Sequence, residues 1–210
     1  MLEFTVEDWS REEVARLRGI YEPLAQSVRE LVDATIRTEA DAETVAEVKR
    51  DIDAAVARLR SRQIAGAFGV RHTASGESVG WGNAVIGVRN ALAPPLVTGV
   101  DESGRVAAEF HLGAAYEGPP GHVHGGVSAL ILDHVLGESA SLDRKPRFTG
   151  TITVRYLRAT PLGPLRAEAV RTRTDGVKTY CSGYIADPEG ITVEAEGVFI
   201  LPRWLRDEES

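Results

Sequence analysis

The stretch YEGPPGHVHGGVSALILDHVLGESAS, residues 116–141, joins an irregular loop to a strongly apolar segment and decides the fold. Its first eleven residues contain two prolines and four glycines, a composition that excludes regular secondary structure. From about Gly126 to Ser141 the sequence predicts a helix, whose apolar side chains point in nearly every direction when each residue advances by about 100°. Because a helix that is apolar all round is a buried helix, we expect it at the centre of the fold, with the loop leading to its N-terminus.

Segments on both sides of this helix show the alternating pattern and the glycine-rich boundaries of strands. The dipeptide Asp175-Gly176 and the run Asp187-Pro188-Glu189-Gly190 are typical of tight turns, which join antiparallel strands. A long antiparallel sheet that wraps one buried helix satisfies both patterns, so we predict an α+β fold. The predicted strands are Gly80–Val88, Arg105–Leu112, Thr149–Arg158, Leu165–Thr174, Lys178–Ala186 and Ile191–Leu201.

The first 63 residues are rich in Ala, Glu, Arg and Leu, and we predict two or three helices there. Apolar residues recur within them at three- and four-residue steps between charged residues, which predicts an amphipathic helix packed against the main domain or a partner subunit. We therefore divide the chain into an N-terminal helical extension, residues 1–63, and a main domain, residues 64–210. The apolar stripe consists of Val45, Val48, Ile52, Val56 and Leu59.

Composition excludes several classes of protein. A hydrophobic content of 43% in 210 residues is ample for a core. The formal charge of -7 argues against a nucleic-acid-binding protein. The strongly apolar run Val127–Leu132 is far shorter than the roughly 20 residues that span a bilayer, and Met1–Trp9 lacks the pattern of a signal peptide. The single cysteine, Cys181, excludes an intramolecular disulfide. We expect a cytoplasmic protein without a membrane span.

The start of the predicted helix offers backbone N–H groups to a ligand. The first amides of a helix lack internal partners and lie at the positive end of its dipole, and glycine allows another molecule to approach closely. The Gly126 amide, helped by Gly125, is therefore suited to stabilise an oxyanion in a transition state. A tight turn without a chemical role is the alternative interpretation of this Gly-Gly pair.

Asp133 stands in the middle of the apolar helix, where an ionised carboxylate costs free energy unless partners or water reach it. Small residues line the same helix face at Ala129 and Gly137, which leaves space for a ligand or for close approach of a strand. A chemical role competes with a structural one, in which the carboxylate accepts hydrogen bonds from the backbone or an arginine. Thr149 heads the next predicted strand, where its hydroxyl either orients a water near Asp133 or simply begins the strand.

A metal centre is not predicted. His122 and His124 are close enough in sequence to suggest a pair of ligands, but no cysteine lies near them and one carboxylate would have to complete the site. We expect a site that works without a metal or a cofactor.

The quoted residues resemble the PaaI-like superfamily of hotdog-fold acyl-CoA thioesterases over about residues 66–202. The resemblance rests on the His-Gly-Gly turn at His124, on an aspartate nine positions later and on the threonine that heads the next strand, with the run Asn90–Leu96 adding to it. It implies a hotdog fold, in which an antiparallel sheet wraps around a central helix. It also implies that subunits pair their sheets edge to edge, as a homodimer or as a homotetramer built from two dimers.

The resemblance implies the reaction as well: hydrolysis of an acyl-CoA to a carboxylic acid and free coenzyme A, with the coenzyme present only as part of the substrate. Gly126 would supply the oxyanion amide, Asp133 would be the nucleophile or general base, and Thr149 would hold the attacking water. The aspartate and the oxyanion turn act from opposite subunits in this superfamily. His124 would shape the turn and contact the thioester carbonyl.

The substrate would also meet residues beside this centre. The resemblance places Gly125 and His122 along the substrate, and Arg158 near a phosphate of coenzyme A, with a solvated arginine as the alternative. Three other functions stay open: a non-catalytic acyl-CoA or lipid-binding protein, a hotdog hydratase using His124 and Asp133, and an interaction protein that works through its extension. A pure binder gains nothing from a costly carboxylate at Asp133, which favours catalysis.

Overall fold

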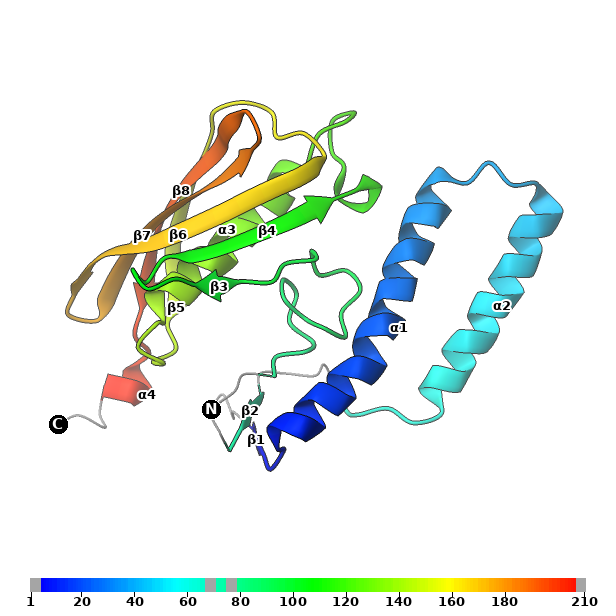
Figure 1. The fold of residues 1–210 in the computed structure, drawn as a ribbon, viewed down its shortest axis with the longest axis horizontal. Coiled ribbons are helices and arrows are strands. Elements are labelled where there is room, and N and C mark those ends of the chain that lie inside the picture. Colours follow the sequence, from blue (N-terminus) through cyan, green and yellow to red (C-terminus); the bar gives the residue numbers. More distant parts are fainter. Residues whose placement is uncertain (1–4, 67–70, 75–78, 207–210) are drawn as a thin grey trace. The chain divides into compact units, whose positions relative to one another are not determined.

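The computed structural model describes residues 5–66, 71–74 and 79–206. The chain divides into two compact units, Met1–Ala93 and Pro94–Ser210. The first unit is mainly helical, and the second contains a six-stranded sheet and a long helix (Figure 1). The predicted start of the main domain at residue 64 stays a prediction.

The second unit is built on an antiparallel sheet with the strand order β3-β4-β6-β7-β8-β5. Gly176, with a φ of 54°, and Gly190, with a φ of 131°, lie in the two tight turns that join β6 to β7 and β7 to β8. Both turns occur where the sequence predicts them. The strands are β3 (Gly99–Val100), β4 (Val106–Leu112), β5 (Phe148–Tyr156), β6 (Gly163–Asp175), β7 (Lys178–Asp187) and β8 (Gly190–Ile200).

Helix α3 (Gly125–Ala140) packs against this sheet, with its closest contacts to β6, β7 and β8 (Figure 1). Its large, fully buried side chains are Ile131, Leu132, Val135 and Leu136. The burial of these large aliphatic side chains, about 1.5–3 kcal/mol each, holds the helix in the sheet. The predicted α+β class, with an antiparallel sheet around a central helix, is confirmed. Two short helices, η1 (Ala114–Tyr116) and α4 (Arg203–Arg206), complete the unit.

The first unit contains helices α1 (Arg11–Arg37) and α2 (Ala42–Arg60), in agreement with the helical prediction. Each begins at a capping side chain: the Ser10 hydroxyl accepts the Glu13 N–H, and the Asp41 carboxylate accepts the Thr44 N–H. The helix α1 is anchored by a small apolar cluster of Val14, Val79 and Trp81, supported by Trp9, Leu17, Tyr21 and Val88. Strands β1 (Thr5–Glu7) and β2 (Arg71–Thr73) form a parallel pair.

The predicted strand Gly80–Val88 is wrong, because this segment forms consecutive turns. The Asn83 side-chain oxygen accepts the N–H groups of Val85 and Ile86, at 2.7 and 3.1 Å. The Gly87 N–H donates to the Asn83 carbonyl, where a Cβ would approach that oxygen to 2.3 Å. An asparagine side chain that satisfies nearby backbone donors competes with strand formation, and the apolar alternation around it does not reveal this.

No helix in the described parts of the chain is long and apolar enough to cross a membrane.

Candidate active site

The loop before α3 is built by hydrogen bonds between its own backbone groups. The Gly118 N–H donates to the His122 carbonyl, and the His124 N–H donates to the Tyr116 carbonyl, each at 2.9 Å. A Cβ on Gly118 would lie 2.8 Å from the His124 Cα, so this close approach requires glycine. The side chain of Glu117 accepts the Gly121 N–H at 2.5 Å. The loop therefore delivers His124 to the helix start in a defined conformation.

His124 caps α3 through its side chain. Its Nδ1 accepts the N–H of Gly126 at 3.0 Å, which satisfies one of the orphan donors of the first helical turn. The Gly125 N–H, one residue earlier, donates to no group in the described parts of the chain. The amide that remains available at the helix start is thus that of Gly125, whereas the sequence analysis gave the leading role to Gly126.

Tyr156, at the end of β5, holds the other side of this turn. Its hydroxyl donates to the Gly125 carbonyl at 2.8 Å, and a Cβ on Gly125 would lie 3.3 Å from the same hydroxyl. This contact was not predicted. A signal for it exists in the sequence, because Tyr156 shares its strand face with the apolar residues Ile152 and Val154.

Asp133 and Thr149 meet, although they come from α3 and β5. The Thr149 hydroxyl donates to the Asp133 Oδ1 at 2.8 Å. The second carboxylate oxygen, Oδ2, accepts no hydrogen bond from the described residues. One turn further along α3, a Cβ on Gly137 would lie 3.3 Å from the Phe199 ring. The missing side chain at Gly137 therefore allows Phe199 of β8 to pack closely against the helix. The Asp133 carboxylate is therefore oriented by one hydrogen bond, and its Oδ2 stays available to accept another.

Two predicted substrate-binding residues have partners within the chain. The His122 Nδ1 lies 2.8 Å from the Pro120 carbonyl, which keeps the ring in the loop. The Arg158 guanidinium donates to both oxygens of Asp187 and, at 3.0 Å, to the Gly190 carbonyl. This hydrogen-bonded pairing lowers the pKa of Asp187 to about 2. Arg158 thus stabilises the β7–β8 turn, and its contact with a coenzyme phosphate stays a prediction.

A second ionisable pair lies on another face of α3. The His134 Nε2 is 3.7 Å from the Glu138 Oε2, and the Thr98 hydroxyl donates to the Glu138 Oε1 at 3.0 Å. Burial lowers the pKa of His134 and raises the pKa of Glu138. Among the described residues neither side chain forms a hydrogen bond or ion pair with Asp133. Asp133 is therefore not one half of a carboxylate pair on this helix.

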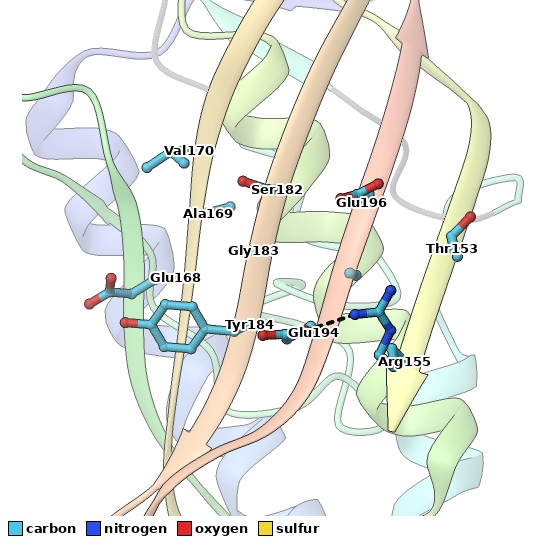
Figure 2. A pocket seen from close by; sticks show the side chains of 11 residues that line it. Thr153, Arg155, Glu168, Ala169, Val170, Ser182, Gly183, Tyr184, Glu194 and Glu196 are labelled. Carbon is cyan, nitrogen blue, oxygen red and sulfur yellow. Dashed lines mark ion pairs between the residues drawn. The ribbon is translucent and has the colours of Figure 1, made fainter. Parts of the chain in front are cut away.

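A cavity of about 380 Å³ lies elsewhere on the sheet, over β5–β8 (Figure 2). Glu194 and Glu196, which line it, alternate along β8 with the buried Val193 and Ala195, so the cavity lies on the sheet face opposite to α3. Figure 2 shows the ion pair between Arg155 and Glu194, which are 3.6 Å apart. Neither Asp133 nor the Gly125 turn borders it, so we place the candidate active site at the helix.

Comparison with a solved structure decides the family. The protein RHA08564, described as a thioesterase superfamily protein, matches 86% of this chain and 90% of its own chain, with 36% sequence identity and a TM-score of 0.78. The chain belongs to the thioesterase superfamily. The family model described as Thioesterase superfamily matches residues 120–193, which include the end of the loop, α3 and Thr149. The predicted superfamily and its hotdog fold are confirmed.

Two further similarities are more distant. This thioesterase-superfamily chain is 29% identical over 94 residues to human acyl-coenzyme A thioesterase THEM5, and the match covers 43% of this chain and 38% of that protein. The chain thus spans well under half the length of this relative. The E. coli PaaI protein from the phenylacetic acid degradation operon matches 51% of this chain and 80% of its own, with 14% identity and a TM-score of 0.48.

Proposed function

We propose that this thioesterase-superfamily member hydrolyses an acyl-CoA thioester to a carboxylic acid and free coenzyme A. The proposal rests chiefly on the pair of Asp133 and Thr149. Asp133 is half-buried on α3, one of its oxygens is held at 2.8 Å by the Thr149 hydroxyl, and the other has no partner among the described residues. The similarity to an acyl-coenzyme A thioesterase supports the substrate class.

In the proposed reaction Asp133 acts on water as a general base. Its free Oδ2 takes a proton while the water oxygen adds to the thioester carbonyl carbon, which gives a tetrahedral oxyanion. The C–S bond then breaks, and the thiolate of coenzyme A leaves and recovers the proton. In the alternative the carboxylate attacks directly and water hydrolyses the resulting anhydride. A single turnover in ¹⁸O-labelled water separates these routes, because only direct attack leaves ¹⁸O in Asp133.

The oxyanion would be stabilised at the start of α3. The Gly125 N–H is the available donor, and the helix dipole adds a positive potential at the same place. His124 supports this donor indirectly, since it caps Gly126 and fixes the turn. Tyr156 supports it from the other side by holding the Gly125 carbonyl. We therefore transfer the oxyanion role from Gly126 to Gly125.

We also propose that a complete site needs two chains, because the superfamily resemblance places the aspartate and the turn on opposite subunits. A homodimer, or a homotetramer built from it, would bring Asp133 of one subunit to the Gly125 turn of the other. The free cysteine Cys181 fits a reducing compartment such as the cytoplasm. Co-expression of Asp133→Asn chains with Gly125→Pro chains should restore activity in mixed dimers, whereas each variant alone stays inactive.

The decisive experiment is thiol release from short, medium, long and aromatic acyl-CoAs. Wild type should turn over at least one class, and Asp133→Asn should lose about 10²–10⁴-fold in kcat, the usual contribution of a general base. Glu138→Gln is the matched control on the same helix and should keep its activity. Wild-type protein that binds an acyl-CoA without hydrolysing any would contradict the proposal and establish a non-catalytic acyl-CoA-binding protein instead.

A further inference from the structure

Helix α2 carries an apolar stripe that the described residues leave uncovered. No residue of α2 is buried. Four members of the stripe are exposed: Val45, Val48, Val56 and Leu59, at 48%, 43%, 37% and 54% of their accessible surface. A helix of this length draws most of its stability in water from the packing of its apolar face. The stripe therefore needs a surface to cover it.

The stripe has the width of a two-helix seam. Val45, Val48, Ile52, Ala55 and Leu59 occupy the alternating three- and four-residue steps of positions a and d in a heptad, and Val56 lies beside them at position e. The e position of the preceding heptad is Lys49, so the apolar stripe stays close to the narrow a/d seam of a coiled coil, whereas a helix that joins a globular core presents a broader apolar face. The geometry calls for one other helix with a matching seam.

The charges beside the seam indicate which helix that is. Asp51 and Arg58 lie on the same side of the seam, seven residues apart, at position g of successive heptads. Neither forms an ion pair within the described residues. Other charges on the helix do pair within it: Lys49 Nζ lies 2.5 Å from Asp53 Oδ2, and Arg50 lies 3.7 Å from Glu47. Two opposite charges are thus left beside an uncovered seam.

We propose that α2 binds the α2 helix of a second copy of this chain, in antiparallel orientation. Around a two-fold axis the g positions of antiparallel helices face each other, so Asp51 of each copy lies opposite Arg58 of the other, and the interaction occurs twice. In the same register Val48 packs on Leu59 of the second copy and Ile52 on its Ala55, which alternates large and small side chains.

A parallel pair fits the same residues less well. It would place Ile52 against its own copy, and it would bring Asp51 next to Val56 of the second copy instead of an arginine. Charge complementarity therefore selects the antiparallel arrangement. This contact involves the extension alone and adds to the proposed function a second way in which chains associate.

Cysteine crosslinking tests the register in the full-length chain. Asp51→Cys and Arg58→Cys chains are prepared separately and mixed, and a short bismaleimide joins thiols that lie opposite each other. The mixture should give a covalent dimer, while each variant alone should give little. Cys181 is 2% exposed and does not compete. A dimer from mixed Asp51→Cys and Val56→Cys chains, without one from the first mixture, would establish a parallel pair. No product in either mixture would show that something other than a second α2 covers the stripe. Either result overturns the proposal.

Charge exchange tests the partner independently, with sedimentation equilibrium and chain exchange as readouts. Asp51→Arg alone and Arg58→Asp alone each turn two attractions into two repulsions, which should weaken the contact by about tenfold at low salt. The double variant Asp51→Arg/Arg58→Asp should regain wild-type association, since the exchanged charges again face each other. A partner other than a second α2 would not be rescued in this way. The exchange Glu47→Arg/Arg50→Glu, away from the seam, is the matched control and should have no effect.

Discussion

Helices α3 and α2 are similar in length, at 16 and 19 residues, but differ in what surrounds them. Seven residues of α3 are buried and none of α2 is. The sequence of each helix matches this difference: α3 is apolar on almost every side because the sheet packs around it, whereas α2 carries an apolar stripe on one side between charged residues. A charged side chain on α3 therefore needs partners, water or a role, while most charged side chains on α2 lie in solvent.

The largest expected contrast concerns the first residue of each helix. Gly125→Pro removes one N–H group at a position where proline is well tolerated, so the proposed oxyanion donor is lost and the fold is kept. Removal of such a donor typically lowers kcat by about 10²–10³-fold. Ala42→Pro makes the same change at the start of α2 and should leave thiol release unchanged.

Gly125→Ala separates the amide from the space around it. This variant keeps the N–H and adds a Cβ 3.3 Å from the Tyr156 hydroxyl. It should retain most of the activity that Gly125→Pro loses. Equal losses in both variants would show that the close contact with Tyr156, and not the amide, is the important feature.

The next contrast is in stability. Leu136 is fully buried in α3, so Leu136→Ala should lower the free energy of unfolding by about 2–5 kcal/mol. Val48→Ala in α2 should change the free energy of unfolding of the second unit by less than about 0.5 kcal/mol, as substitutions at exposed positions usually do. Urea unfolding followed by far-ultraviolet circular dichroism measures both effects. A large effect of Val48→Ala on the unfolding of the second unit would contradict this expectation.

Replacing glycine by alanine should change the free energy of unfolding in opposite directions in the two units. A Cβ on Gly197 in β8 would lie 2.5 Å from the Phe199 ring, so Gly197→Ala should lower the free energy of unfolding by about 1–3 kcal/mol through overpacking. A Cβ on Gly19 in α1 meets nothing within 4 Å, so Gly19→Ala should stabilise the helix by about 0.5–1 kcal/mol. Thermal unfolding of each variant provides the measurement, and a gain at Gly197 would contradict the packing described for β8.

The smallest expected effects depend on pH. Arg158 lowers the pKa of Asp187 to about 2 from an ordinary 3.8. The stabilisation from this pair is therefore complete above about pH 4 and is lost as the pH falls toward 2. The difference in stability between wild type and Asp187→Asn should shrink over that range. Asp53→Asn, which removes an ion pair with both partners well exposed on α2, should show almost no such dependence. Parallel pH profiles for the two variants would contradict this distinction.

Much of the second unit could be predicted because its sequence patterns are local. The all-round apolar pattern of residues 127–136 predicts α3, and the turns at Asp175-Gly176 and Asp187–Gly190 predict the meander of β6, β7 and β8. The strand predicted at Gly80–Val88 failed because the decisive interaction is a side-chain bond from Asn83, which leaves the apolar alternation unchanged.

The candidate site was predictable in its residue types but not in its contacts. The cost of a carboxylate in an apolar helix singles out Asp133, and the spacing to Thr149 follows the superfamily pattern. Which of two adjacent glycine amides is free depends on the ring position of His124, and the support from Tyr156 depends on the pairing of β5 in the sheet. Three-dimensional placement decides both, and no short sequence pattern encodes it.

The cap that His124 forms on α3 also determines where its ring carries a proton. A nitrogen that accepts the Gly126 N–H must keep its lone pair, so the neutral imidazole is the Nε2–H tautomer. In that form the outward nitrogen is a hydrogen-bond donor and has no capacity to take up a proton. In the proposed reaction His124 would therefore donate to a substrate carbonyl oxygen, and proton abstraction would fall to Asp133. Nitrogen-15 chemical shifts of the ring report this tautomer directly.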